Sequence, residues 1–321
     1  NEYDFIDLGQ FVCNWELTAD GIVVQTGTLD TGSIAPASAE EFTIPYAPIE
    51  AQAGVEYYVN LSWKLAGDTR YASKGHEQAY YQFKLPIDVP SELMVNGPAP
   101  EAELVNDGVK IIAGATEVIF SRNTGTIAQL KINGREIIAK ASDGLLCSVF
   151  RAPGDNDKFG WKGLDNYNIE VKSFTSLLIG EVYVVSVSAV YTSPEAGSIN
   201  VNTIWNVFGN GVISSDNEIA LEGGPAVLPR VGFDMKLAAD LSRVSYLGMG
   251  PFENYVDRKS AAKFGLYQTT VKGMYEYYQK PQFCGNRSEV RWAALSDESG
   301  KGVLLVADES MDFSALEYTQ K

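Results

Sequence analysis

The stretch that decides the fold is a pair of runs, EVYVVSVSAVY at residues 181–191 and SINVNTIWNVF at residues 198–208. Both runs are rich in β-branched and aromatic residues, which are enriched in strands. Pro194 and Gly197 lie between them, and residues of these types mark turns. The runs therefore predict a long β-hairpin, and their alternation of apolar and polar residues predicts antiparallel β layers.

Similar short runs surround this hairpin in the second part of the chain. Turns that contain Gly and Asn separate them, and Asn133-Gly134 and the stretch 122–125 are typical hairpin turns. We expect strands at 109–113, 117–120, 127–132, 135–138, 211–215 and 230–237.

The first part of the chain has the same character. Asp20 and Gly21 form an Asp-Gly turn between two alternating runs, which predicts a second hairpin. Several short strands with turn signals between them favour an immunoglobulin-like β-sandwich. The expected strands lie at 11–17, 22–27, 41–44, 55–65 and 79–85.

A connection that contains several prolines separates these two parts. Pro86, Pro90, Pro98 and Pro100 frame a short apolar piece, which indicates a stiff linker. The predicted fold class is all-β, with an immunoglobulin-like β-sandwich followed by a larger antiparallel one. We place the first sandwich at 1–88, the linker at 89–100 and the second sandwich at 101–321.

Charge limits the classes of partner. The formal net charge is −16, and residues 1–88 hold 4 Lys and Arg against 13 Asp and Glu. Neither part offers a basic stripe, so we expect no nucleic-acid partner and no membrane partner. No apolar run approaches the roughly 20 residues that a membrane-spanning helix needs. Nothing in the sequence indicates a compartment.

The three cysteines, Cys13, Cys147 and Cys284, lie far apart and form no C-x-x-C pair. An odd number argues against a complete disulfide framework. Cys13 and Cys147 stand in apolar runs, which indicates buried thiols. We expect no zinc site.

Residues 150–161, FRAPGDNDKFGW, place oxygen acceptors and a large indole after the end of a predicted strand. Such residues are typical of a loop that contacts a sugar, because hydroxyls need acceptors and C–H faces pack on aromatic rings. The alternative is a turn in which Asp and Asn side chains bond their own backbone. An EF-hand is excluded, because Phe159 and Asn166 stand where a polar ligand and a bidentate Glu are needed. Incidental cation binding by Asp155 and Asp157 stays open.

Four motifs resemble those of the large β-galactosidases of glycoside hydrolase family 2. Residues 151–157 match R-A-P-x-D-N-D, and residues 247–258 match L-G-x-G-P-x-E-N-Y-x-D-R. Residues 228–232 match L-P-R-x-G, and residues 75–83 match G-H-E-x-A-x-x-Q-F. The four occur in the family's order and cover nearly the whole chain. The chain therefore resembles the C-terminal region of such an enzyme.

The resemblance implies an immunoglobulin-like domain followed by a supersandwich related to galactose mutarotases. In the family this second domain continues beyond the position of Lys321. Both catalytic glutamates of the family lie on a (β/α)8 barrel that precedes residue 1, so no catalytic residue, cofactor or metal site is expected in this chain. Magnesium and sodium are often used at that barrel. The implied partners are the barrel of the same longer protein and a galactoside at its rim, and the longer protein is implied to be a homo-oligomer.

The same resemblance implies the site residues. In the family, the loop after the first motif lies beside the mouth of the barrel. The residues of this substrate-rim loop would be Asp155, Asn156, Asp157, Gly160 and Trp161. The other motif residues imply a polar network that holds loops together, in which we expect Arg230 to bury its charge against an acid of the second motif. Its members would be Arg151, Arg230, Glu253, Asn254, Tyr255, Asp257 and Arg258.

Two other functions need comparison. A mutarotase-like epimerase uses a histidine with a carboxylate, but the one histidine, His76, lies in the first part of the chain and is expected to be structural. The 5 Trp and 17 Tyr leave a stand-alone carbohydrate-binding module as the alternative function.

Overall fold

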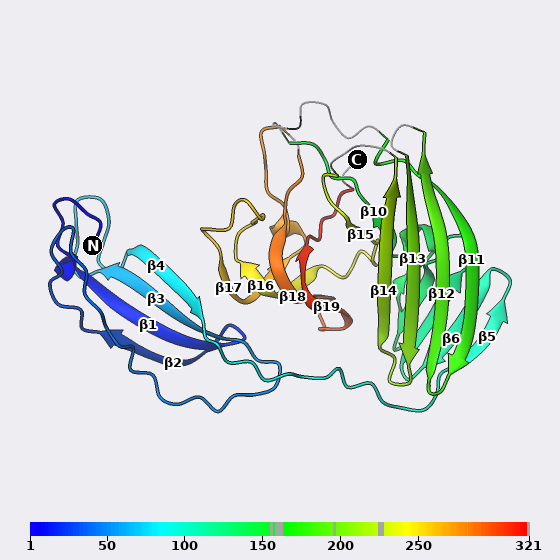
Figure 1. Ribbon diagram of the computed structural model, residues 1–321, viewed down its shortest axis with the longest axis horizontal. Helices are drawn as coiled ribbons and strands as arrows, with labels where there is room; N and C mark the ends of the chain where they lie inside the picture. The colour runs from blue at the N-terminus through cyan, green and yellow to red at the C-terminus, as the bar shows by residue number, and fades with distance from the viewer. Residues whose placement is uncertain (155–156, 158–162, 195–196, 224–227, 281, 320–321) are drawn as a thin grey trace.

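The computed structural model describes residues 1–154, 157, 163–194, 197–223, 228–280 and 282–319. These residues form antiparallel sheets with little helix, so the all-β fold class is confirmed (Figure 1). The helices in the described part are short 3₁₀ turns: η1 (Leu8–Gln10), η2 (Ala141–Asp143) and η3 (Lys272–Met274).

The first sheet is four-stranded, in the order β2-β1-β3-β4. The predicted hairpin is confirmed: Asp20 and Gly21 have φ of 46° and 77° and join strands whose last paired residues are Ala19 and Ile22. Positive φ at both central residues is the geometry that suits right-twisted hairpins. The strands are β1 (Phe11–Ala19), β2 (Ile22–Leu29), β3 (Tyr57–Leu65) and β4 (Glu77–Lys84).

An extended segment, rather than further strands, covers one face of this sheet. Ile44 and Ile49 pack against the cluster of Trp15, Leu17 and Val59. The strand predicted at 41–44 was therefore wrong, since these residues are extended but unpaired. Prolines follow the segment closely, and proline cannot donate to a sheet ladder.

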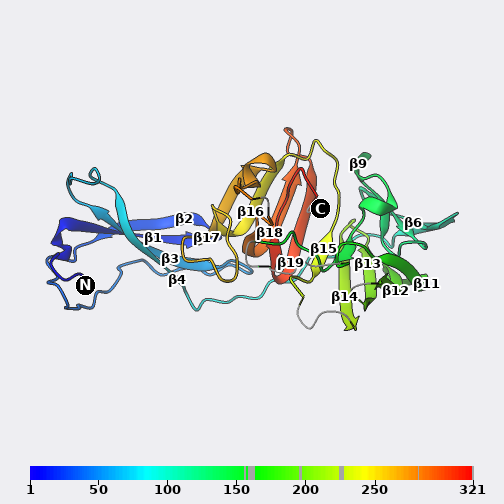
Figure 2. The same cartoon turned by 90° about the horizontal axis from the view of Figure 1, so that it is seen from above.

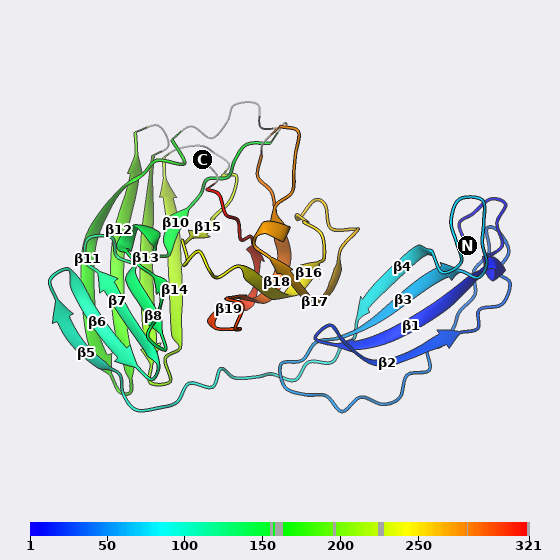
Figure 3. The same cartoon turned by 180° about the vertical axis from the view of Figure 1, so that it is seen from behind.

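The second part of the chain contains two sheets packed face to face, best seen from behind (Figure 3). One is a meander of β5 (Glu101–Val105), β6 (Gly108–Ala113), β7 (Thr116–Ser121), β8 (Ile127–Ile132) and β9 (Arg135–Ile138). The other is a meander of β11 (Asn168–Ile179), β12 (Val182–Ser193), β13 (Gly197–Phe208) and β14 (Ile213–Glu222).

The hairpin that decided the fold lies at the centre of the second of these sheets. β12 and β13 pair from Val182 with Phe208 to Ser193 with Gly197, so the predicted hairpin is confirmed. Trp205 of β13 meets Phe120 of β7 with ring centroids 5.3 Å apart, and this contact joins the two sheets across a shared core. The alternation of the sequence thus places one face of each strand in that core.

A pair of short strands stands beside this sandwich. β10 (Leu146–Ser148) pairs with β15 (Gly232–Asp234). The strand predicted at 230–237 is confirmed only over these three residues of β15. β10 ends shortly before the first motif, and β15 begins at Gly232, the last residue of the L-P-R-x-G motif, so the small sheet brings these two motifs together.

Another four-stranded sheet, in the order β17-β16-β18-β19, lies between the first sheet and the sandwich (Figure 2). The strands predicted from the sequence do not include those of this sheet, although the second motif begins on one of them. It consists of β16 (Arg243–Gly250), β17 (Lys263–Thr270), β18 (Arg287–Ser296) and β19 (Gly302–Phe313).

The first sheet packs on this middle sheet through specific side-chain contacts. Tyr58 stacks on Phe264 with centroids 4.7 Å apart. The Gln82 amide donates to the Phe264 carbonyl at 2.8 Å and accepts from the Phe264 N–H at 2.7 Å. The Glu56 carboxylate accepts from the Arg291 guanidinium at 3.1 Å and 3.2 Å. Apolar, amide and charged contacts thus hold the two sheets together independently of the linker.

The connection between β4 and β5 passes beneath the middle sheet as an extended segment (Figure 1). Leu93 and Met94 are 60% and 75% exposed, although both are apolar. Its first residue is tied by the Leu85 N–H, which donates to the Tyr57 carbonyl. Further along, the Gly54 N–H donates to the Val89 carbonyl and the Asn210 amide donates to the Met94 carbonyl. The linker bounds of 89–100 stay a prediction.

Limited proteolysis should cut first within 87–100, because that segment makes few contacts. The two pieces should then stay associated, because the Tyr58–Phe264 interface remains intact. Gel filtration after the cut measures this.

Glu56→Gln should weaken the association, whereas Glu16→Gln, an exposed acid of the same sheet, should not. Preferential cutting within 55–65 would contradict the placement of the sheet.

Acid should weaken the same association. Burial opposes ionisation of Glu56, but hydrogen bonds from Lys84 and Arg291 outweigh burial and hold the pKa of this carboxyl below its usual value. Separation of the pieces removes the Arg291 hydrogen bonds but not Lys84, which lies on the same piece as Glu56. The part of the lowering that comes from Arg291 stabilises the docked state fully above the ordinary glutamate pKa of about 4.3. This contribution is lost as the pH falls through the lowered value, so the cleaved pieces should separate more readily there.

The thiols of Cys13 and Cys147 should react slowly with a thiol reagent in the folded chain and fast in denaturant. Both are buried and free, and burial raises the pKa of Cys147 to about 11. Because the thiolate is the reactive form, burial and a raised pKa both slow the reaction. A mass that showed an intramolecular disulfide would contradict this prediction.

Candidate functional site

The first motif leaves β10 and turns back on itself. The Arg151 guanidinium donates to both oxygens of the Asp157 carboxylate, at 2.7 Å and 3.1 Å. The Gly154 N–H donates to the same carboxylate at 2.6 Å. We call Arg151, Gly154 and Asp157 the Arg151 cluster. Its bidentate ion pair fixes the orientation of both side chains.

The other residues expected in the rim loop lie outside the described residues. They are Asp155, Asn156, Gly160 and Trp161.

The second motif begins on β16 and leaves the sheet after Gly250. Gly248 allows β16 to approach β18 closely, because a Cβ there would lie 2.8 Å from the Val290 Cα. The chain then turns at Pro251, so that the polar residues of the motif lie beyond the end of the sheet.

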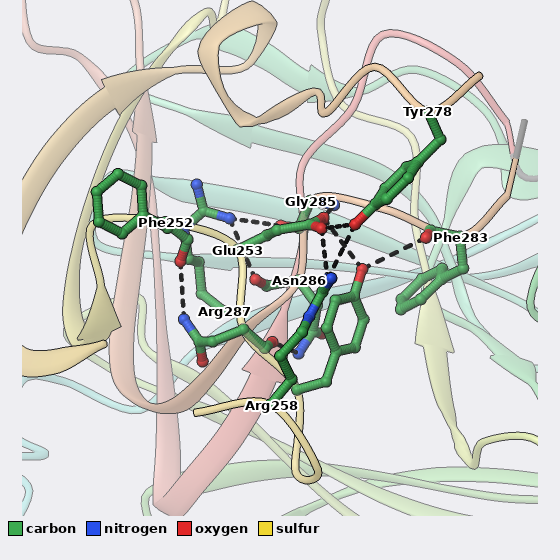
Figure 4. A network of polar contacts seen from close by, with 10 residues as sticks. Phe252, Glu253, Arg258, Tyr278, Phe283, Gly285, Asn286 and Arg287 are labelled. Atoms are coloured by element: carbon green, nitrogen blue, oxygen red, sulfur yellow. Dashed lines mark hydrogen bonds and ion pairs between the residues drawn. The ribbon is translucent and has the colours of Figure 1, made fainter. Parts of the chain in front are cut away.

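Glu253 is the centre of the contacts that follow (Figure 4). Its side chain is only 9% exposed. One carboxylate oxygen accepts from the Arg258 guanidinium at 2.6 Å and from the Tyr278 hydroxyl. The other accepts from the Gly285 N–H at 2.9 Å and from the Tyr255 hydroxyl at 3.2 Å. The carboxylate thus joins the second motif to the segment between η3 and β18.

Asn254 ties the same two segments together through their backbones. Its N–H donates to the Asn286 carbonyl at 2.9 Å, and the Asn286 amide donates back to the Asn254 carbonyl at 2.8 Å. The Asn254 side-chain oxygen accepts from the Ser288 N–H at 2.9 Å, and its amide donates to the Met249 carbonyl at 3.0 Å. Asn254 is fully satisfied and is 1% exposed.

Tyr255 and Arg258 complete the network, and Asp257 is exposed beside it. Burial, reinforced by the Glu253 carboxylate, raises the pKa of the Tyr255 hydroxyl, which therefore stays protonated and donates. Arg258 lies over the Tyr255 ring, 5.0 Å from its centroid. We call Glu253, Tyr255, Arg258, Tyr278 and Gly285 the Glu253 network.

The prediction that Arg230 pairs with an acid of the second motif is wrong. It forms an ion pair with Asp234, four residues further along, on β15. The side chain of Arg230 is 20% exposed and that of Asp234 is 58% exposed. The charge of Arg230 is therefore neutralised by an acid close to it in the sequence.

One large open cavity, of about 3250 Å³, has the motifs on its walls. Arg151 and Asp157 of the first motif, Arg230, and Tyr255 and Arg258 of the second motif all line it. The structure therefore places the three motifs around one space, although they are far apart in the sequence.

Sequence patterns do not indicate several residues that belong to the Glu253 network or lie beside it. Tyr278 and Gly285 lie in an irregular segment without periodicity, and Asn286 lies directly before β18. Arg287 is 2% exposed and donates to the Tyr246 hydroxyl at 3.1 Å. The sequence shows here only a group of Tyr, Asn and Arg residues near the end of an irregular segment. Such a group has no fixed spacing from which its contacts could be predicted.

Metal ligands do not gather in the described part of the chain, where no three His, Cys, Asp or Glu side chains lie in positions to hold an ion. Within the same residues, no helix is long and apolar enough to cross a membrane. His76 is exposed, and its backbone carbonyl accepts from the Leu65 N–H at 3.0 Å.

Glu253→Gln should lower the free energy of unfolding by about 2 kcal/mol, because hydrogen bonds to an ionised group are worth about 1.5–3 kcal/mol each. Chemical denaturation measures this. Glu289→Gln is the matched control, since Glu289 pairs with Lys259 in a half-exposed ion pair worth at most about 1 kcal/mol. Equal losses of unfolding free energy in the two variants would show that the Glu253 network stabilises the fold no more than a half-exposed ion pair does.

Comparisons with known proteins agree with this architecture. The family model for the beta galactosidase small chain matches residues 113–321, and the one for beta-galactosidase domain 4 matches residues 1–86. A beta-galactosidase of Priestia megaterium is 26% identical over 99% of this chain, and one of Pseudoalteromonas haloplanktis is 28% identical over 95%. A beta-galactosidase of Kluyveromyces lactis is 29% identical over 89% of the chain. The chain spans 31%, 30% and 28% of the lengths of these three relatives. Since the first model covers well over half of its residues, the chain belongs to the beta galactosidase small chain family.

Proposed function

We propose that this chain is the non-catalytic C-terminal part of a longer β-galactosidase, the parent, which hydrolyses terminal β-D-galactosides. The chain would support a (β/α)8 barrel elsewhere in the parent and lend the loop of the Arg151 cluster to the rim of its active site. The relatives support this class of activity, because each bears the name beta-galactosidase and the chain matches about three tenths of its length.

The observation that supports a non-catalytic role is that hydrogen-bond donors occupy the acceptor positions of the Glu253 carboxylate. An ionised carboxylate offers about four lone-pair directions. Arg258 and Tyr278 donate to one oxygen, and Gly285 and Tyr255 donate to the other. No acceptor direction is left for a sugar hydroxyl or for attack on an anomeric carbon. This carboxylate therefore holds loops together rather than reacting with substrate.

Hydrolysis further requires two carboxyl groups about 5–5.5 Å or 6.5–9.5 Å apart, with pKa values driven apart by their surroundings. Burial raises the pKa of Asp20 and of Asp312. Asp20 lies in the turn between β1 and β2 and Asp312 lies on β19, so they belong to different sheets. Within the described residues, no hydrogen bond or electrostatic contact joins these two carboxyl groups, which is in keeping with a catalytic pair outside this chain.

The remaining parts of the proposal concern the parent. Magnesium and sodium would bind at the barrel, and the described residues of this chain offer them no cluster of ligands. The barrel and a galactoside would be the partners of the rim loop, and the parent would be a homo-oligomer.

A carbohydrate-binding module is the second candidate, and one observation favours it. Tyr81 and Phe83 on the edge strand β4 are 59% and 52% exposed. Their rings are nearly parallel, at 15°, with centroids 6.3 Å apart. Exposed aromatic faces can pack against the C–H faces of sugars. Titration with galactose and lactose tests it: shifts of the Tyr81 and Phe83 ring resonances would favour a module, and no shifts would favour the scaffold.

The purified chain should leave a chromogenic β-galactoside unhydrolysed above the buffer background. Catalysis requires a nucleophile, an acid and a sugar pocket in one preorganised site, and this chain supplies at most a rim. Hydrolysis that persisted through rigorous purification would overturn the proposal.

In the parent, Asp157→Ala should lower kcat/KM for galactosides about tenfold, because the loss of a charge-assisted pair frees the rim loop. Glu298→Ala is the control, since its ion pair with Arg243 lies exposed on the middle sheet. The melting temperature must be measured beside the kinetics. Full activity at unchanged stability would show that the loop is only a turn.

A further inference from the structure

The Arg151 cluster touches the segment that the Glu253 network holds. A Cβ at Gly154 would lie 3.1 Å from the Gln282 side-chain oxygen, closer than ordinary van der Waals contact. Gly154 is not one of the glycines with positive φ, so its backbone does not itself require glycine. The missing side chain instead leaves room for Gln282.

The segment that carries Gln282 is fixed on both sides. The Tyr278 hydroxyl and the Gly285 N–H both donate to the Glu253 carboxylate. The Phe283 carbonyl accepts from the Tyr255 hydroxyl at 3.4 Å, and the two rings meet edge to face with centroids 5.7 Å apart. Hydrogen bonds therefore hold the chain before Gln282, at Tyr278, and after it, at Phe283 and Gly285.

Both groups face the same space. Gln282, Tyr278 and Phe283 line the cavity together with Gly154 and Asp157. The Glu253 carboxylate holds Gly285, three residues after Gln282, and the Gln282 side-chain oxygen lies beside Gly154. The Gly154 N–H in turn donates to the Asp157 carboxylate.

We propose that Gln282 is a positioning residue through which the Glu253 network fixes the Arg151 cluster at the wall of the cavity. The second motif then determines the position of the first motif. The effect on catalysis rests on the proposed function, whereas the contact itself does not.

Trypsin cleavage after Arg151 in the 321-residue chain reports on this contact, because a fixed Arg151 is a poor substrate. Gln282→Ala should speed this cleavage about tenfold, which corresponds to about 1.4 kcal/mol of local protection. Tyr277→Ala is the matched control, since it removes a larger side chain that is 85% exposed from the same segment. It should leave the rate unchanged.

A double-mutant cycle separates this contact from a general loosening. Gly154→Ala pushes on Gln282 and should speed cleavage in the native background, but have a smaller effect beside Gln282→Ala. An unchanged rate in Gln282→Ala, or strictly additive effects, would overturn the inference. If the cycle shows coupling while Gln282→Ala leaves kcat and KM of the parent unchanged, the contact stands and the rim function fails.

Discussion

The burial of the Glu253 carboxylate is the constraint on which the candidate site depends. Removing an ionised carboxylate from water costs several kcal/mol, and only well-placed donors offset that cost. Two of those donors, Tyr278 and Gly285, come from an irregular segment that has no sheet ladder of its own. The carboxylate therefore gives this segment a fixed place, and the wall of the cavity is built on it.

The parts of the fold that follow from local rules could be predicted from the sequence. The turn at Asp20 and Gly21 needs two residues with positive φ, and the alternation of β12 and β13 marks a strand face. The middle sheet was missed because its strands pair mostly over long loops. The edge strand β11 (Asn168–Ile179) was missed because one side faces no partner strand and its polar residues hide the alternation.

The site was accessible to sequence reasoning only where a motif carried it. Resemblance drew attention to Glu253 and Arg258, and the structure brings them within 2.6 Å. Tyr278 donates to the same carboxylate from 25 residues further along the chain, and no spacing rule links it to the motif. Arg230 shows the opposite case, since a local partner, Asp234, was available on the strand that follows. Non-local contacts fixed by tertiary packing were the part that sequence patterns could not supply.

The size of the cavity indicates how the site can act. Pockets that enclose small ligands have volumes of about 300–1,000 Å³. The space between these sheets, at about 3250 Å³, is too large to enclose a single sugar. Under the proposed function, selectivity for a sugar would therefore come from side chains held rigidly at the edge of this space rather than from its volume. Arg151 and Asp157 are paired in such a way, and a paired rim group contributes shape and hydrogen-bonding edges without presenting an unbalanced charge.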